Sequence, residues 1–489
     1  MRDHRAAGKA IDRAQLSLAR LPPSPPASVL VAFVRLCNYR LRLRPKAAPG
    51  ALPLAVEISM HFIIVGNGVA GIQAALTLRE RLPDPATTHI TIISDESDYF
   101  ISRTALMYAY TEKLQRRDLE PYERRLYRDK HLTLRRARVV DLDADAKTVT
   151  LGDGESLAYD GLLLSVGAKP RSADFAGLDK VRDGLVNFVS LQDLDHCERL
   201  TPTTRRAVIV GGGLIGIELV ECLRHHGVEV TFLVRSPWFW PAALGADEGE
   251  FIAAHMREHG VDLRLEEQVQ EVKVDENGRV CAVRTESGEE IDCQMLGVAI
   301  GVTPNCEWLR AVKTPPALAR GIRVDRAFRT SLPQVWAAGD CAEIDQDTGN
   351  TLVETIWYSA KRHGILAAQS MLGDPVRYET PVFFNSSKFF DIEFTTVGDL
   401  EDAPPGSTTL YRKMPERPIS QRIVANAAGE VIGFNMLGSR FDHRILTRWI
   451  QEKRGLDWVR DNLEHAQFDV EFGRVPLQKM TETTDRPKE

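Results

Sequence analysis

The chain has 489 residues, a hydrophobic fraction of 43% and a formal net charge of −6. One core rarely holds a chain of this length, so we expect about three domains of roughly 100–200 residues each. The slightly acidic balance argues against a nucleic-acid-binding surface, and no apolar run reaches the roughly 18 residues that span a bilayer. The seven cysteines form no CxxC pair. This pattern indicates a reduced, cytoplasmic protein and argues against a zinc site or a disulfide scaffold.

The first 59 residues differ in composition from the rest. They hold ten Lys or Arg against three acids, and they include the proline-rich patch at residues 21–26. Three interpretations stay open: an Arg-rich targeting peptide, a basic interaction tail, or translated upstream sequence that does not belong to the protein. We expect this segment to be disordered or a non-native extension, and the folded protein to begin with a strand at Met60.

A strand, a glycine turn and a helix follow Met60. The apolar residues 61–65 lead into a GxGxxG fingerprint and then into an Ala/Leu-rich helix through Glu80. The first glycine permits a tight turn, the second lets the backbone approach a pyrophosphate, and the third lets the helix pack closely on the strand. The next strand, Ile90–Ile93, ends where an acid binds ribose hydroxyls. The expected cofactor-binding residues of this unit are Gly66, Gly68, Val69, Ala70, Gly71 and Asp95.

The same unit recurs about 145 residues later. A strand at residues 207–210 runs into a second glycine turn, and a helix follows through Arg224 before the strand Val228–Val234. Two such fingerprints form an internal repeat. One chain with two dinucleotide sites is typical of enzymes that pass hydride from one dinucleotide to another. The expected contacts of the second site are Gly211, Gly213, Leu214, Ile215 and Gly216.

Three further motifs follow in a fixed order. They are LLLSVGAKPR at residues 162–171, AIGVTPN at 299–305 and VWAAGD at 335–340. Together with both fingerprints, they resemble the two-dinucleotide-binding-domain flavoproteins of the glutathione reductase superfamily. Within it the chain is most similar to ferredoxin reductases, the flavin domain of NADH-dependent nitrite reductase and apoptosis-inducing factor. The resemblance runs from Met60 to about Asp399 and implies a flavoprotein oxidoreductase, with FAD on the first site and NADP or NAD on the second.

The resemblance also implies roles for single residues around the FAD. The glycines Gly66, Gly68 and Gly71 cradle its pyrophosphate, and Asp95 binds the adenosine ribose, with Glu96 as the rival. Arg103 lies near the pyrophosphate, unless it only forms a surface salt bridge. Trp357, ahead of a helix at Ala360–Met371, covers the flavin, unless it packs at the domain seam. The resemblance implies six further cofactor contacts. One is the backbone at Val139, and the others are Gly167, Arg171, Gly301, Gly339 and Asp340.

Two departures from the related sequences restrict the chemistry. Disulfide reductases carry CxxxxC on the helix that here includes Ile101–Tyr108, and this stretch has no cysteine, so a redox disulfide beside the flavin is not expected. Ferredoxin reductases place a lysine near the flavin at the position of Tyr108. Glu218 matches the acid that pairs with that lysine, so we expect Glu218 to have another partner or to lie near the nicotinamide.

The nicotinamide preference depends on Arg235, which lies 19 residues after Gly216. An acid at this strand end binds the free 2′-hydroxyl of NADH, whereas an arginine offers a bidentate partner to a 2′-phosphate. Arg235 therefore favours NADPH. The alternative is an exposed arginine that stacks on adenine and tolerates either nucleotide.

The predicted fold is α/β, with two Rossmann-like FAD/NAD(P)-binding domains of three ββα layers and a C-terminal α+β interface domain. In the second domain, strands Arg279–Arg284 and Glu290–Met295 are expected to form a small meander. The C-terminal domain should contain strands within Pro381–Gly398 and an amphipathic helical region at Ile445–His465 that packs on its core. The expected segments are 1–59, 60–183 (FAD, first part), 184–300 (NAD(P)), 301–374 (FAD, second part) and 375–489.

The sequence leaves the electron acceptor open. It could be an iron–sulfur protein of the ferredoxin or rubredoxin type, oxygen, a quinone or a small molecule. A redox-sensing interaction protein like apoptosis-inducing factor is the alternative from another class. No metal site is expected, the sequence does not identify a catalytic side chain, and the C-terminal domain resembles one that mediates homodimers in relatives.

Overall fold

The computed structural model describes residues 59–400, 404–414, 417–468 and 481–483. Contacts divide the chain into two units, Met1–Met60 and His61–Glu489. The expectations for the first 59 residues therefore lie, except for Ser59, outside the described residues. The expected strand does begin at Met60. Among the described helices, none is both long and apolar enough to cross a membrane.

The first fingerprint lies in a five-stranded sheet. Strands β19, β7 and β1 run parallel, as do β2 and β3. Strand β19 comes from far along the chain and pairs with β7, so the chain leaves this sheet and returns to it. The sheet order is β19-β7-β1-β2-β3, with β1 at Met60–Val65, β2 at Thr88–Ser94, β3 at Leu132–Arg136, β7 at Gly161–Leu164 and β19 at Val335–Ala337.

Helices and smaller sheets complete this part of the molecule. Helix α2 (Val69–Arg81) packs against α8 (Trp357–Met371) so closely that a Cβ on Gly364 would lie 2.1 Å from the Ala70 carbonyl oxygen. The helix α8 begins at Trp357, three residues before the predicted start. Two small sheets accompany them: β4 (Val139–Asp143), β5 (Thr148–Leu151) and β6 (Ser156–Ala158), and β18 (Ile322–Val324), β20 (Ala342–Asp345) and β21 (Thr351–Leu352).

The second fingerprint lies in a sheet of parallel strands with layers on both faces. Along its strand β10, Ala207 and Ile209 join a core shared with helices, whereas Val208 and Val210 join a core shared with the meander. This alternation produces the three expected layers. The sheet order is β12-β11-β10-β16-β9, with β9 at Leu185–Val186, β10 at Arg206–Val210, β11 at Glu229–Val234, β12 at Val261–Leu265 and β16 at Met295–Val298. Its helices are α5 (Leu191–Leu200), α6 (Leu214–His225) and α7 (Ala246–Glu258).

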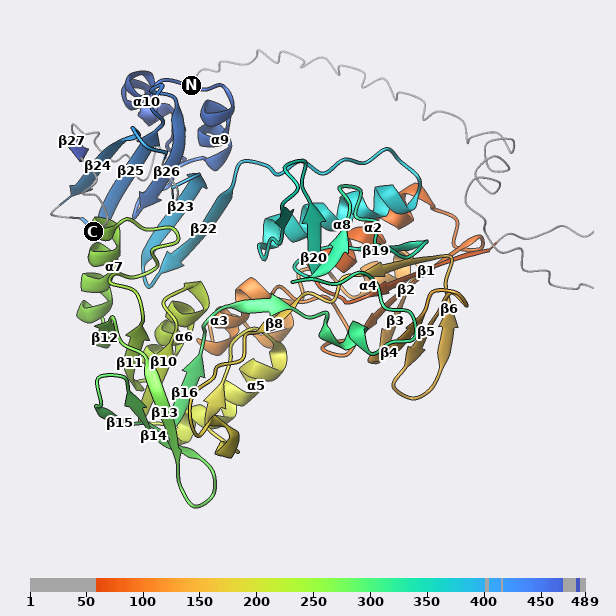
Figure 1. The fold of residues 1–489 in the computed structure, drawn as a ribbon, viewed down its shortest axis with the longest axis horizontal. Helices are drawn as coiled ribbons and strands as arrows, with labels where there is room; N and C mark the ends of the chain where they lie inside the picture. The colour runs from red at the N-terminus through yellow and green to blue at the C-terminus, as the bar shows by residue number, and fades with distance from the viewer. Residues whose placement is uncertain (1–58, 401–403, 415–416, 469–480, 484–489) are drawn as a thin grey trace, which may run out of the picture. The chain divides into compact units, whose positions relative to one another are not determined.

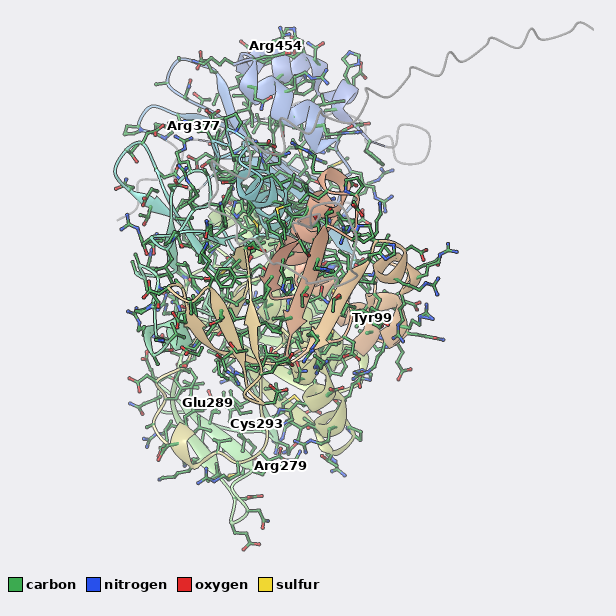
Figure 2. All side chains as sticks on the ribbon, turned by 90° about the vertical axis from the view of Figure 1, so that its right-hand side faces the viewer. Tyr99, Arg279, Glu289, Cys293, Arg377 and Arg454 are labelled. Carbon is green, nitrogen blue, oxygen red and sulfur yellow. The ribbon has the colours of Figure 1, made fainter. Side chains whose placement is uncertain are left out.

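The meander differs from the prediction at one end. It consists of β13 (Val269–Val274), β14 (Val280–Thr285) and β15 (Glu290–Asp292). Figure 2 labels Glu289 and Cys293, which precede and follow β15 in the chain. The predicted strand Glu290–Met295 is wrong because Met295 already pairs with Ala207 in the parallel sheet. The two connections between the large sheets pair with each other as β8 (Ala168–Pro170) and β17 (Val302–Pro304).

The C-terminal part is an antiparallel sheet with helices against it, as Figure 1 shows. The predicted helical region is two helices, α9 (His443–Gln451) and α10 (Leu456–Asn462), because the chain turns between them at Lys453 with a φ of +54°. The sheet order is β22-β23-β26-β25-β24-β27, with β22 at Phe384–Phe389, β23 at Ile392–Gly398, β24 at Thr408–Met414, β25 at Ile419–Ala425, β26 at Val431–Leu437 and β27 at Thr481–Thr483.

Candidate functional site

The first glycine of each fingerprint makes a turn that other residues cannot make. Gly66 has a φ of +109°, and a Cβ on it would lie 2.1 Å from the Ser165 carbonyl oxygen. Gly211 has a φ of +115°, and its Cβ would lie 2.2 Å from the Ala299 carbonyl oxygen. Both positions combine left-handed backbone with contact to a neighbouring strand end, so glycine is required at each.

The third glycine of each fingerprint brings the helix against its own turn. A Cβ on Gly71 would lie 2.0 Å from the Gly66 carbonyl oxygen, and one on Gly216 would lie 2.1 Å from that of Gly211. These two contacts have the same geometry in both sheets. They are the close approach of helix and strand that the sequence predicted.

The middle glycines have open space beside them. A Cβ on Gly68 or Gly213 would meet no atom within 4 Å. Each is the N-cap of its helix, without a side-chain cap, so the first N–H groups of α2 and α6 are available to an anion. The pyrophosphate of a dinucleotide fits both places. Behind these caps, the first helical residues are Val69 and Ala70 in α2 and Leu214 and Ile215 in α6.

The two acids after β2 have different surroundings. Glu96 forms a close ion pair with Arg103 and accepts a hydrogen bond from the Leu191 N–H at 3.2 Å. Arg103 also donates to the Val189 carbonyl at 2.7 Å, so it makes the salt bridge that was the alternative to a pyrophosphate contact. Asp95 is exposed, with the Arg138 guanidinium 3.9 Å away. Glu96 therefore ties the two domains together, and Asp95 is the acid left facing solvent.

The late motif lies against the first glycine turn. A Cβ on Gly339, whose φ is +80°, would lie 3.0 Å from the Cβ of Ala70. Burial raises the pKa of Asp340 to about 6, against the lowering effect of the charges of Arg103 and His363. A half-buried carboxylate in this position favours a partner that donates hydrogen bonds, as the hydroxyls of a ribityl chain do.

Two more polar atoms near this site are buried without a hydrogen-bond partner, the Oδ1 atom of Asn67 and the Nε1 atom of Trp357. Asn67 lies inside the first fingerprint, and Trp357 is the first residue of α8. Buried polar atoms are normally paired. These orphans therefore fit a site built for a polar ligand, and the residues present are compatible with FAD.

The remaining residues expected on the FAD side lie on the connections between the domains or beside them. The side chain of Val139 is buried in β4, where the residue pairs with Leu151. Gly167 accepts a hydrogen bond from the Asn305 N–H at 3.0 Å, and Gly301 accepts one from the Arg171 N–H at 3.0 Å. The arginine side chain itself is exposed.

Glu218 lies where the first and second sites meet. Burial and the charge of Glu221 raise the pKa of Glu218 and the charge of Lys388 lowers it, with a net value of about 7. The Lys388 ammonium forms a close ion pair with Glu221 and lies 6.0 Å from the ring centre of Tyr108, on helix α3 (Leu106–Tyr110). Lys388, which the sequence analysis did not single out, is paired with Glu221, and its charge acts on Glu218.

Two other features bear on the chemistry. Cys197 and Cys222, near α3, are buried free thiols, and burial raises the pKa of both, which makes them poor nucleophiles. On the second sheet, Arg235 follows β11 directly and is exposed, as contact with a bound 2′-phosphate requires.

One group of side chains has the residue types of a metal site. The Nε2 atom of His255 lies 2.5 Å from Oδ1 of Asp391, and that of His259 lies 3.8 Å from the same oxygen. Zinc–nitrogen bonds of about 2.1 Å would hold tetrahedral ligand atoms roughly 3.3 Å apart. The shorter contact is a hydrogen bond, so in this structure the group is an ion pair between α7 and the β22–β23 turn.

Comparisons with known proteins agree with this geometry. The model of the family "Pyridine nucleotide-disulphide oxidoreductase" matches residues 60–364. The ferredoxin–NAD(+) reductase component of the p-cumate 2,3-dioxygenase system of Pseudomonas putida is 27% identical over 402 residues, which cover 81% of this chain and 94% of that protein. Rhodocoxin reductase of Rhodococcus erythropolis is 31% identical over 338 residues, 68% of this chain and 76% of that protein.

Solved structures share the fold. In the covalent putidaredoxin reductase–putidaredoxin complex, the matching chain has a TM-score of 0.70 at 23% identity, with 81% of this chain and 92% of that chain covered. Reduced CoADR-RHD of Bacillus anthracis has a TM-score of 0.72 at 25% identity, with 82% and 76% covered. The family match includes both glycine turns.

Proposed function

Because the chain belongs to the pyridine nucleotide-disulphide oxidoreductase family and is an FAD-dependent NAD(P)H oxidoreductase, we propose that it passes electrons from NADPH through FAD to a small iron–sulfur protein. The observation that carries this proposal is the repeated glycine turn. Each large sheet has one, with the same backbone, the same close contacts and the same open side. Two dinucleotides on one chain are what hydride transfer between them requires.

On the first site, the N-terminus of α2 and the open side of Gly68 hold the FAD pyrophosphate, and Asp95 accepts hydrogen bonds from the adenosine ribose. Asp340 accepts hydrogen bonds from the ribityl hydroxyls, which compensate for the burial of its carboxylate. Trp357 covers the flavin and gives its indole N–H a partner. Bound FAD supplies the redox chemistry, since it accepts hydride from the nicotinamide and returns electrons to an acceptor.

The acceptor is an iron–sulfur protein for two reasons. The described cysteines are free, and none lies on α3, so electrons have no route through a disulfide beside the flavin. In addition, one relative carries ferredoxin in its name, and the structure of another reductase was solved in complex with putidaredoxin. A protein acceptor that receives electrons directly from the flavin fits both observations.

NADPH is the preferred donor because Arg235 is exposed at the end of β11. Its guanidinium can form a charge-assisted contact with the 2′-phosphate, which NADH lacks. Hydride transfer between the two bound cofactors would need water to be excluded from the site.

The decisive experiment is steady-state NADPH oxidation with a ferredoxin, a rubredoxin, a quinone and oxygen as separate acceptors, and with ferricyanide as the control for flavin reduction. We expect ferricyanide turnover together with rapid reduction of one iron–sulfur protein. Rapid ferricyanide turnover with neither iron–sulfur protein reduced would refute the proposed acceptor. Slow turnover with a long-lived reduced flavin–nicotinamide complex would instead indicate a redox sensor.

A further inference from the structure

The hairpin of β22 and β23 delivers a lysine to the surface of the second sheet domain. Only 17% of the Lys388 side chain is exposed, and its partner Glu221 is 12% exposed. A lysine beside a hairpin turn normally extends into water. Here its ammonium is held in a close ion pair with α6, and it also donates to the Phe390 carbonyl at 2.9 Å.

The turn that follows fixes this lysine in place. Phe390 and Asp391 form a two-residue turn, with Phe390 at a φ of +55°. The ring of Phe389, directly after the lysine, is fully buried and stacks on Phe394 at 4.5 Å. Asp391 pairs with His255 on α7. The hairpin is thus attached to α6 on one side and to α7 on the other, and Lys388 has little freedom to move.

The lysine lies between parts of both cofactor sites. Helix α6 starts at the second glycine turn, and Glu218 and Glu221 lie on successive turns of it, three residues apart. Tyr108 belongs to α3, and the segment leading into α3 begins at Arg103, whose charge reaches Asp340. The region between α3 and α6 is therefore the junction of the two sites.

Without the positive charge of Lys388, the junction would carry an excess of negative charge. The groups that face it are the carboxylates of Glu218 and Glu221, the Cys222 thiol and the Tyr108 ring. On the hairpin itself, the charge of Lys388 lowers the pKa of Glu393. Lys388 is the cation that these groups share.

We propose that Lys388 is a positioning residue of hydride transfer: from the C-terminal domain, it supplies the positive charge beside Glu218 and Glu221 on α6. This rests on the cofactor sites proposed above. Lys388 keeps Glu218 and Glu221 from repelling each other and holds Glu218 at the edge of the nicotinamide site. The C-terminal domain thereby takes part in the reductive half of the reaction.

The proposal predicts a specific pH dependence. Burial raises the pKa of Glu218 to about 7, and Lys388 counteracts this rise. When the lysine charge is removed, the pKa of Glu218 must rise further, so the carboxyl group keeps its proton to higher pH. An ionisation at about pH 7 in the rate of flavin reduction should then move upward in Lys388→Met and stay in place in Lys388→Arg.

The experiment follows flavin reduction by NADPH in stopped flow, between about pH 5 and pH 9, in proteins whose FAD content is first measured from flavin absorption. We expect Lys388→Met to slow reduction about tenfold, the loss of one charge-assisted contact, and Lys388→Arg to restore most of the rate. Lys413→Met is the matched control. Lys413 is exposed in the same domain and lies 5.3 Å from the Phe251 ring centre, and its loss should change neither rate nor pH profile.

A wild-type rate and profile in FAD-loaded Lys388→Met overturns the proposal, as does an arginine variant with the defect of the methionine variant. If Lys388→Met does not load FAD, Glu218→Gln provides the test instead. The ionisation near pH 7 must then be absent from the pH profile of Glu218→Gln. If that ionisation persists, the proposal is overturned. A different result would show that the proposed cofactor sites are wrong. In that case the wild-type protein takes up no FAD, or NADPH fails to reduce the bound flavin.

Discussion

The open side of Gly68 allows a substitution that separates FAD binding from folding. Gly68 has a φ of −82° and a ψ of −175°, in the extended region that valine adopts readily. A Cβ there meets no protein atom within 4 Å. Gly68→Val should therefore leave the apoprotein folded, at a cost of about 1 kcal/mol or less for a poorer N-cap. Its side chain would fill the space that the pyrophosphate needs.

The expected loss of FAD affinity is large. If valine displaces the pyrophosphate from two N–H groups of α2, two charge-assisted hydrogen bonds of about 1.5–3 kcal/mol each are lost. The sum of about 3–6 kcal/mol corresponds to a Kd for FAD that is about 10²–10⁴ times higher. The matched control is Gly66→Ala, where the φ of +109° and a Cβ 2.1 Å from the Ser165 carbonyl should cost about 2 kcal/mol or more in the free energy of unfolding.

The assay titrates both apoproteins with FAD by flavin fluorescence and unfolds them in urea. We expect Gly68→Val to keep the unfolding midpoint of wild-type apoprotein and to lose FAD, and Gly66→Ala to lower the midpoint. Wild-type FAD affinity in Gly68→Val would refute the placement of the pyrophosphate. A midpoint as low as that of Gly66→Ala would show that the open side of Gly68 does not exist in solution.

Three further substitutions test the remaining parts of the site. Gly213→Val should keep FAD and lose NADPH, so its flavin stays oxidised when NADPH is added; normal reduction would contradict the second site. Arg235→Ala should raise the NADPH Michaelis constant about tenfold, the lower end of a charge-assisted contact, and leave NADH unchanged; an equal loss for both nucleotides would assign Arg235 to adenine stacking. Asp340 has a raised pKa of about 6, so the stability it adds to the apoprotein is complete below its unfolded pKa of about 4 and is lost as pH rises through 6. Asp340→Asn should remove this loss of stability, which is up to about 3 kcal/mol. Urea unfolding at several pH values measures the free energy of unfolding against pH. If the slope of this dependence is the same in Asp340→Asn as in wild type, the carboxylate is not buried in solution.

The two glycine turns could be predicted because their geometry is local. The turn, the open N-cap and the close helix contact of each fingerprint depend on three glycines within six positions. The strand before and the helix after them are equally local patterns. The joint order of the later motifs then identified the family, which the match over residues 60–364 confirms.

Other features depend on contacts that no local pattern contains. Asp95 and Glu96 are neighbours in the sequence, and the contacts of Glu96 with Arg103 and the Leu191 N–H distinguish their surroundings. The start of α8 could not be read because its N-cap, Ile356, has no capping side chain. The strand predicted through Met295 was wrong because the side chain of Gln294 accepts hydrogen bonds from two backbone N–H groups beside β10 and draws the chain into the other sheet.

The place of Lys388 beside α6 could not be predicted from the sequence. It requires a hairpin from another domain to reach that helix. What places the lysine there is the two-residue turn at Phe390 and Asp391 and the anchor on His255, all distant from Glu218 in the chain. A substitution that loosens this turn should therefore alter the reductive step without touching either cofactor site. In this protein, the charge beside Glu218 depends on how the C-terminal domain docks.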